Sequence, residues 1–277
     1  MSLIKSLLKV GMPLAVAAAA LAAAKVRELA APKKEKPHSD APIIVALGDS
    51  ITFGAGVIKT RTTDTWEYKL EKLLGGAYQV LNYGISGATL QNEGDSPYWN
   101  MPDKLRQGFP EAALSLNPEI VILMLGTNDS KPYNWNRGRY EAQLDERVRE
   151  IKAVPAVKRL ILMCPPYACP ADGSDTVGYD IINETIRDEI VPIVKKCAQD
   201  NGVECVDLYA LTDGHSEYFA DGVHPNSFGN RVIAAALHRH ITQADRPKRL
   251  GTTLTPPTCV CRRYLNMPIL SSKNCAY

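Results

Sequence analysis

The sequence predicts an α/β fold, a three-layer α/β/α sandwich of the flavodoxin-like kind with a five-stranded parallel sheet. Five short apolar runs, typical of strands buried on both faces, alternate with longer stretches of helical periodicity. Small polar residues follow four of these runs, as they do where parallel strands end beside a ligand. The chain has 277 residues, 45% of them hydrophobic and 22% charged, which is enough to bury one substantial core.

The strands and helices are expected to alternate along the chain. The apolar runs predict strands at residues 43–47, 78–82, 120–125, 159–163 and 203–208. Amphipathic periodicity predicts helices at residues 65–74, 139–151, 179–199 and 227–241. Strands connected by helices pair in parallel and are covered on both faces. We therefore assign the folded domain to residues 42–242.

The first 31 residues are interpreted as a signal peptide or signal anchor. Lys5 and Lys9 flank the start of an alanine-rich apolar run over residues 10–24, and no acidic residue precedes Glu28. The run is shorter than the roughly 20 apolar residues of a membrane span. We therefore expect a secreted or periplasmic protein, with membrane anchoring and import into an organelle as the alternatives.

Two further segments flank the expected domain. Residues 32–41 are proline-rich and charged, which is typical of a linker. Residues 243–277 have neither helical nor strand periodicity, so an irregular C-terminal tail is expected there. The formal net charge is only +2 and the basic residues are dispersed, which argues against a nucleic-acid partner.

The seven cysteines leave the redox state open. An odd number cannot all pair within one chain, and their spacings match no common zinc site. Cys197 and Cys205 flank a predicted helix-to-strand turn, where either a disulfide or buried free thiols would fit.

Four polar clusters are expected to meet at one edge of the sheet. They are GDS at residues 48–50, NYGISG at 82–87, GTND at 126–129 and DGVHPN at 221–226. The carboxyl ends of parallel strands lie on one edge, so these clusters converge whatever their separation in sequence. Taken one at a time, each cluster also fits an ordinary turn or helix cap.

The clusters contain the groups needed for nucleophilic catalysis. Ser50 is the candidate nucleophile, His224 its candidate base, and Asp221 the group that orients the imidazole. The spacing of three between Asp221 and His224 lets a carboxylate and an imidazole meet across one turn. His215 is the competing base, although it lacks the polar turn and helix start that flank His224.

Donors for an oxyanion are also present. Gly84 brings a backbone N–H that no side chain shields, Asn128 brings a side-chain amide, and the Ser50 N–H completes the set. Turn chemistry explains each glycine or asparagine alone, but it does not explain four such clusters in this order.

Taken together, the four clusters resemble those of the SGNH hydrolases, also called the GDSL esterases and lipases. The resemblance covers residues 42–241 and departs from the family name at Ile51, where leucine is usual. It implies a flavodoxin-like α/β/α fold, Ser50, Asp221 and His224 as catalytic residues, and Ser50, Gly84 and Asn128 as the oxyanion hole. It implies no metal and no cofactor.

Two longer strings indicate a subset of the family. SGATLQNEGDSPYW and MLGTNDSKPYNW are similar to segments of bacterial carbohydrate acetylesterases. Tyr133 and Trp135 are the candidate substrate-binding residues, and Tyr98 and Trp99 are further aromatics that could face a sugar ring. Aromatic residues near a site also often have only a packing role.

The expected function is therefore hydrolysis of short-chain, acetyl esters on a small molecule or carbohydrate. A lysophospholipase or thioesterase acting on longer acyl chains is the alternative within the same chemistry. A flavodoxin-like module that binds a ligand without reaction is the alternative from another class. The G-x-S-x-G elbow, the dinucleotide fingerprint and the Walker motif are all absent from the sequence.

Overall fold

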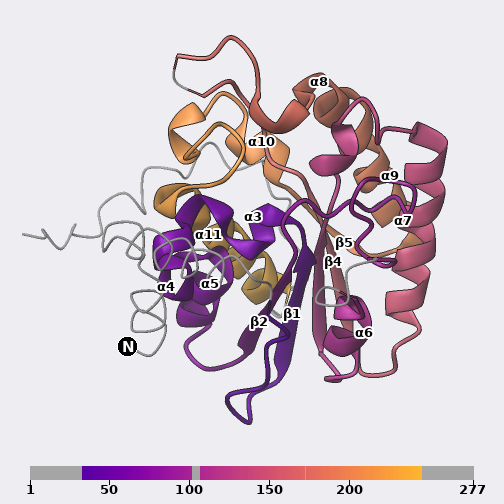
Figure 1. Cartoon of the computed structure of the whole chain (residues 1–277). Coiled ribbons are helices and arrows are strands. Elements are labelled where there is room, and N and C mark those ends of the chain that lie inside the picture. The colour runs from indigo at the N-terminus through magenta and orange to yellow at the C-terminus, as the bar shows by residue number, and fades with distance from the viewer. Residues whose placement is uncertain (1–32, 102–106, 172, 245–277) are drawn as a thin grey trace, which may run out of the picture. The chain divides into compact units, whose positions relative to one another are not determined.

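A single parallel sheet forms the centre of the domain (Figure 1). The computed structural model describes residues 33–101, 107–171 and 173–244. The five strands lie in the order β2-β1-β3-β4-β5, and all neighbours pair in parallel. Their bounds are β1 Ile43–Gly48, β2 Gln79–Gly84, β3 Ile120–Met124, β4 Arg159–Cys164 and β5 Glu204–Asp207. The predicted flavodoxin-like sandwich is thereby confirmed.

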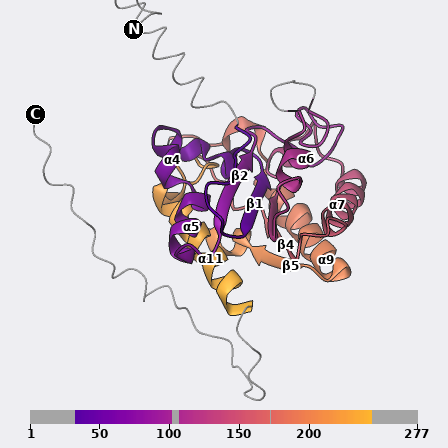
Figure 2. The ribbon, with the colours of Figure 1, turned by 90° about the horizontal axis from the view of Figure 1, so that it is seen from below.

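Helices cover both faces of this sheet, as the view from below shows (Figure 2). The helices that contribute to the two cores on the sheet are α5 Trp66–Leu74, α6 Phe109–Leu114, α7 Arg137–Lys152, α9 Val191–Asn201 and α11 Ser227–Ala244. Short α-helical segments are α3 Ser50–Phe53, α4 Arg61–Asp64, α8 Asn183–Thr185 and α10 Leu208–Thr212. Short segments of other helix types are η1 Ala55–Thr60, η2 Asn128–Ser130, η3 Gly178–Asp180, η4 Ile186–Ile190 and η5 Ser216–Tyr218.

Alternate residues of each strand face two separate cores. In β1, Val45 and Leu47 pack with residues of α6, α7 and α9, whereas Ile44 and Ala46 pack with residues of α5 and α11. All four side chains are almost completely buried. This burial on both faces explains why the strands appear in the sequence as unbroken apolar runs.

The order of the strands reverses at β1. The chain runs from β1 outward to β2, then crosses to β3 on the other side of β1. Gly48, at the end of β1, is in register with Gly84 of β2 and Met124 of β3. The loops after these three strands therefore leave the sheet side by side, at the place where open α/β sheets bind ligands.

Three of the differences from the sequence prediction concern β2, the helix over residues 179–199 and α6. Strand β2 continues to Gly84, so this glycine lies in the strand and not after it. The predicted helix over residues 179–199 is divided, because Tyr179 and Asp180 have left-handed backbone angles, with φ of 63° and 58°. Helix α6, which was not predicted, begins with Phe109 and Pro110 and is only six residues long.

The segment before β1 packs along the exposed edge of β2. The Asn82 N–H donates to the Glu35 carboxylate at 2.7 Å, and the Tyr83 hydroxyl donates to the Glu35 carbonyl at 2.7 Å. Gln79 reaches the carbonyls of Ser39 and Ala41. Edge strands need such cover, because their free N–H and C=O groups otherwise pair with other chains.

The four cysteines in the described part of the chain are free thiols. Cys197 is buried and accepts a contact from Asn201, while Cys205 lies 4.0 Å from Cys164 between their sulfur atoms. The structure thus agrees with the buried-thiol interpretation of Cys197, not with a Cys197–Cys205 disulfide. The other three cysteines, the predicted signal segment and nearly all of the predicted tail lie outside the described residues. No helix within the described ranges is long and apolar enough to cross a membrane.

Candidate active site

Ser50 lies at the start of α3, directly after β1. The Asp49 side chain caps this helix by accepting the Ile51 N–H at 2.9 Å. The turn is tight, since a Cβ on Gly48 would lie 2.2 Å from the Thr52 hydroxyl oxygen. The local sequence therefore holds the Ser50 hydroxyl at the end of the sheet, next to the amide groups of the first helical turn.

His224 and Asp221 meet Ser50 from the far end of the chain. The Ser50 hydroxyl oxygen lies 2.9 Å from His224 Nε2, and His224 Nδ1 lies 2.7 Å from Asp221 Oδ2. Ser50 and His224 are 7% and 8% exposed, so water has limited access to their contact. The three residues form a continuous relay across 174 positions of sequence.

The turn that carries Asp221 and His224 is held from several sides. Asp221 Oδ1 accepts the backbone N–H groups of Val223 at 3.1 Å and His224 at 2.8 Å. Gly222 has a φ of +84°, and a Cβ there would lie 2.0 Å from the Cys169 carbonyl oxygen. Only glycine fits this turn, which explains the glycine between the two side chains.

The Asp221 carboxylate is strongly stabilised in its charged form. Burial alone would raise its pKa, but hydrogen bonds from the His224 ring, the His224 backbone and Tyr179 outweigh burial. Together they hold the pKa of Asp221 well below its usual range. The carboxylate therefore remains an acceptor for the imidazole N–H throughout the neutral range.

Gly84 is not free to serve as an oxyanion donor in this structure. Its N–H donates to Asn82 Oδ1 at 2.9 Å, while Asn82 Nδ2 donates to the Thr52 carbonyl. A Cβ on Gly84 would lie 2.2 Å from the Phe53 nitrogen. Glycine is thus needed at position 84 because β2 packs closely on α3. The prediction from the sequence was instead that this glycine leaves its N–H open to the substrate.

Gly87 lies in the turn that follows Gly84 and the end of β2. A tight turn over residues 85–88 is closed by the Ala88 N–H donating to the Ile85 carbonyl at 3.1 Å. Gly87 has a φ of +83°, and a Cβ there would meet nothing within 4 Å. No hydrogen bond within the described ranges takes up its N–H. The NYGISG cluster contains both Gly84 and Gly87. The sequence alone does not distinguish them, because either glycine fits a turn.

Asn128 lies directly beside this turn. Its Nδ2 donates to the Ala88 carbonyl at 3.1 Å, and its own carbonyl accepts from the Asn134 side chain at 3.0 Å. The neighbouring Asp129 carboxylate accepts the N–H groups of Leu90 and Gln91, both at 2.9 Å. Complete burial raises the pKa of Asp129 to about 6. These bonds fix the loop after β3 against the loop after β2.

The candidate aromatic residues have separate surroundings. Tyr133 is 61% exposed, five residues after Asn128. The Trp135 indole N–H donates to Glu189 at 3.2 Å, and its ring packs 5.5 Å from that of Tyr140. Part of the Trp135 side chain is thus used for packing, and a substrate role for either residue stays a prediction.

Tyr98 and Trp99, the further aromatics that could face a sugar ring, have other surroundings. Tyr98 is completely buried and donates to the Tyr83 carbonyl at 2.5 Å. Trp99 faces the Arg147 guanidinium, 5.2 Å from its ring, beside a surface hollow of about 330 Å³ between α6 and α7. These two aromatics serve the core and a different surface.

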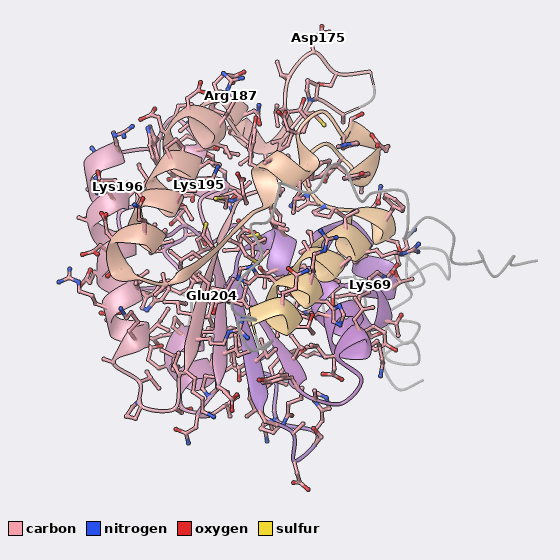
Figure 3. All side chains as sticks on the ribbon, turned by 180° about the vertical axis from the view of Figure 1, so that it is seen from behind. Lys69, Asp175, Arg187, Lys195, Lys196 and Glu204 are labelled. Carbon is pink, nitrogen blue, oxygen red and sulfur yellow. The ribbon has the colours of Figure 1, made fainter. Side chains whose placement is uncertain are left out.

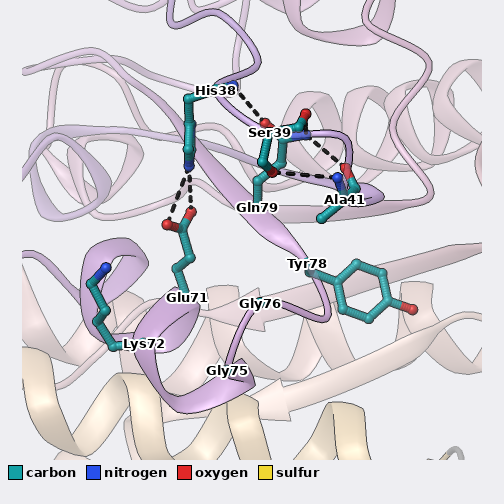
Figure 4. Close-up of a pocket in the computed structure, with 9 residues that line it drawn as sticks. All are labelled: His38, Ser39, Ala41, Glu71, Lys72, Gly75, Gly76, Tyr78 and Gln79. Carbon is teal, nitrogen blue, oxygen red and sulfur yellow. Dashed lines mark hydrogen bonds and ion pairs between the residues drawn. The ribbon is translucent and has the colours of Figure 1, made fainter.

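The competing histidine lies away from Ser50. His215 is exposed, pairs with Glu217 at 2.8 Å and stacks on Tyr218. His38 pairs with Glu71 in another surface hollow of about 430 Å³ (Figure 4). That hollow lies at the amino ends of β1 and β2, the opposite edge from Ser50, so it is not part of this site.

Tyr179 is a further residue of the site, and sequence reasoning missed it. Its hydroxyl donates to Asp221 Oδ2 at 2.8 Å, and its ring lies 5.2 Å from the His224 ring in an edge-on arrangement. It comes from the segment between β4 and α8, which contains none of the four polar clusters, so no motif marks it.

A family model for GDSL-like lipases and acylhydrolases matches residues 46–232, a range that spans Ser50, Asn128, Asp221 and His224. The chain belongs to this family. This membership agrees with the resemblance found in the sequence.

Individual relatives of this GDSL-family chain are esterases by name. It is 34% identical over 224 residues to an acetylxylan esterase of Xylanibacter ruminicola, covering 73% of this chain and 44% of the relative. The chain thus spans less than half the length of that protein. Its structure is similar to an acetylxylan esterase of Geobacillus stearothermophilus, with a TM-score of 0.53, 25% identity and coverage of 72% and 94%. An aryl esterase of M. smegmatis shares the fold, with a TM-score of 0.57, 22% identity and coverage of 73% and 99%.

Metal ligands do not gather in the described part of this GDSL-family chain. No group of three or more His, Cys, Asp or Glu side chains there could hold a metal ion.

Proposed function

We propose that this GDSL-family chain is a serine esterase that removes acetyl groups from carbohydrate through an acyl-enzyme on Ser50. The observation that carries the proposal is the relay from Asp221 through His224 to the Ser50 hydroxyl, with contacts of 2.7 Å and 2.9 Å. These lengths are those of a nucleophile and base already within hydrogen-bonding reach.

The first half of the reaction forms the acyl-enzyme. Asp221 accepts the Nδ1–H of His224, which leaves Nε2 as the acceptor that faces Ser50. As the Ser50 oxygen attacks the ester carbonyl, its proton passes to His224 Nε2. The tetrahedral intermediate then collapses, the sugar hydroxyl leaves with that proton, and the acetyl group remains on Ser50.

The oxyanion of the intermediate needs donors at the end of the sheet. We assign the Ser50 N–H, Asn128 Nδ2 and the Gly87 N–H, with Gly87 in place of Gly84. The support is that Asn82 occupies the Gly84 N–H, whereas Gly87 lies in an open turn beside Asn128. Such preorganised donors are each worth on the order of 10²- to 10³-fold in turnover.

Water completes the cycle. His224, neutral again after the sugar leaves, takes a proton from water as the water oxygen attacks the acetyl carbonyl. The second intermediate collapses, acetate leaves, and the proton returns to Ser50.

The preference for acetyl groups on carbohydrate is supported by the relatives. One curated relative and one similar structure are named acetylxylan esterases. The segment after β4 lies against the site, since the Cys169 N–H donates to the Gly222 carbonyl at 2.9 Å. We infer that this segment forms a wall of the acyl pocket, with Tyr133 and Trp135 as the candidate contacts to the sugar.

Hydrolysis of nitrophenyl esters from acetate to octanoate tests both parts of the proposal. Ser50→Ala should lose on the order of 10³-fold or more of the acetate activity. Ser115→Ala, at an exposed serine after α6, is the matched control and should retain it. Activity retained by Ser50→Ala would contradict the mechanism, and a rate maximum at octanoate would favour a lysophospholipase or thioesterase instead.

Release of acetate from acetylated xylo-oligosaccharides tests the carbohydrate part separately. A kcat/KM above that for nitrophenyl acetate is expected. No release from the oligosaccharide by an enzyme that cleaves nitrophenyl acetate would contradict the substrate but not the chemistry. Export of the chain, and membrane anchoring through the first 31 residues, stay predictions from the sequence.

A further inference from the structure

Tyr179 has an unusual backbone conformation. It lies in η3, and both Tyr179 and the following Asp180 have left-handed φ angles, 63° and 58°. Aromatic residues rarely adopt this region, because the Cβ crowds the backbone. Two such residues in succession persist only where other contacts hold them, and such strain often marks a functional site.

The contacts that hold Tyr179 are made with the proposed catalytic pair. Its hydroxyl donates to Asp221 Oδ2 at 2.8 Å, the same oxygen that His224 Nδ1 approaches at 2.7 Å. Its ring lies edge-on to the His224 ring, with 5.2 Å between centroids. The residue is nevertheless 58% exposed, so burial of its ring does not explain the position.

We propose that Tyr179 is a positioning residue that holds the Asp221–His224 pair in register with Ser50 and shares the charge of the Asp221 carboxylate. This inference rests on the proposed esterase function. The tyrosine hydroxyl fixes the rotation of the carboxylate, so that Oδ2 stays directed at the imidazole. The ring edge limits the movement of His224 on one side.

Sharing the carboxylate has a consequence for the pH dependence of the reaction. The groups that contact the His224 ring are Asp221 on its own turn, Ser50 at the start of α3, and Tyr179 from η3, and the buried Asp49 carboxylate interacts with it electrostatically. When Tyr179 donates to Oδ2, less negative charge is available to stabilise a protonated imidazole. Removing the hydroxyl therefore favours the protonated, inactive form of the base.

Tyr179→Phe removes this hydroxyl and keeps the ring. We expect kcat/KM for nitrophenyl acetate to fall on the order of 10- to 100-fold, within the range for loss of a hydrogen bond to a charged group. We also expect the acidic limb of the pH profile to move to higher pH, with an unchanged melting temperature. Tyr78→Phe is the matched control, because the Tyr78 hydroxyl also donates to a carboxylate, that of Glu119 at 3.1 Å, but at the amino end of β2.

Tyr179→Ala tests the ring as well. It should lower kcat/KM further than Tyr179→Phe, because the edge contact with His224 is also lost. Comparison with Ser50→Ala keeps the inference separate from the proposed function, which fails if that serine variant stays active.

Two results would overturn the role of Tyr179. One is a Tyr179→Phe profile that superimposes on the wild type while Ser50→Ala is inactive. The other is a loss of activity without movement of the acidic limb, which would assign Tyr179 a merely structural role.

Discussion

Asn128 is the donor whose contribution can be isolated most cleanly at the scale of single residues. Its backbone carbonyl is held by Asn134, which keeps the loop after β3 in place when the side chain is changed, and the melting curve measures the cost of losing the bond from the side chain to the Ala88 carbonyl. Asn128→Ala should lower kcat by on the order of 10²- to 10³-fold with little change in KM. Steady-state kinetics together with a melting curve measure both effects.

Asn128→Asp is the sharper companion of that variant. It keeps the shape of the side chain but replaces the donor with a negatively charged acceptor, which repels the oxyanion. Its kcat should fall at least as far as that of Asn128→Ala. Turnover near the wild-type rate in either variant would remove Asn128 from the oxyanion hole.

Sequence reasoning reached Ser50, Asp221 and His224 at this scale because their neighbours specify their geometry. Glycine at position 222 and proline at position 225 constrain the turn, and β1 delivers the serine to the same edge. The choice between Gly84 and Gly87 could not be made in sequence, because it depends on where the Asn82 side chain bonds. Tyr179 could not be found at all, because no motif marks it and its contact with Asp221 depends on how the loop before α8 turns.

The segment before β1 is the most testable feature at the scale of elements. Glu35 accepts the Asn82 N–H on the open edge of β2. Burial raises the pKa of Glu35, because it disfavours the charged carboxylate. A neutral acceptor at this position should therefore bind the Asn82 N–H nearly as well. Glu35→Ala should lower the free energy of unfolding by about 1–2 kcal/mol, because it leaves a partly buried N–H without that acceptor.

Glu35→Gln should stay closer to the wild type, since its amide oxygen can still accept that N–H. Urea denaturation of both variants measures the difference. Equal stability of Glu35→Ala and the wild type would show that residues 33–41 contribute only as a linker.

Elements were predictable where burial alone defines them. The five strands could be found because both faces are covered and the apolar runs are unbroken. The helix predicted over residues 179–199 was wrong at its start. The apolar periodicity that begins after residue 181 continues into the preceding residues of the sequence, although the chain turns at Tyr179. Contacts with Asp221 and His224, far along the chain, override that local pattern.

At the scale of the whole molecule, Glu204 connects the far edge of the sheet to the last helix. Its carboxylate on β5 binds the Arg159 guanidinium of β4 at 2.7 Å and lies 2.7 Å from His240 of α11. Figure 3 shows Glu204 beside the end of that helix. Burial alone would raise its pKa, but Arg159 and His240 outweigh burial and lower the pKa of Glu204 to about 2.

This lowered pKa makes stability depend on pH with a definite sign. The stabilisation is fully present above the ordinary glutamate value of 4.5 and is lost as the pH falls toward 2. Glu204→Gln should therefore lower the free energy of unfolding by about 1–3 kcal/mol at pH 7, and the difference should vanish near pH 2.

Urea denaturation across that pH range measures the difference. Asp49 and Asp129, whose pKa values burial raises to about 6, act in the opposite sense but are present in both proteins. A difference that is independent of pH would contradict the role of the Glu204 charge.

The most direct test of the central claim is the site at which a fluorophosphonate probe reacts. A serine activated by His224 and Asp221 should be phosphonylated, whereas a module that only binds ligands has no reactive hydroxyl. Mass spectrometry of digested wild-type protein should locate the added mass on Ser50, and Ser50→Ala should stay unlabelled. An unlabelled wild-type protein, or a label at any other serine, would contradict the account.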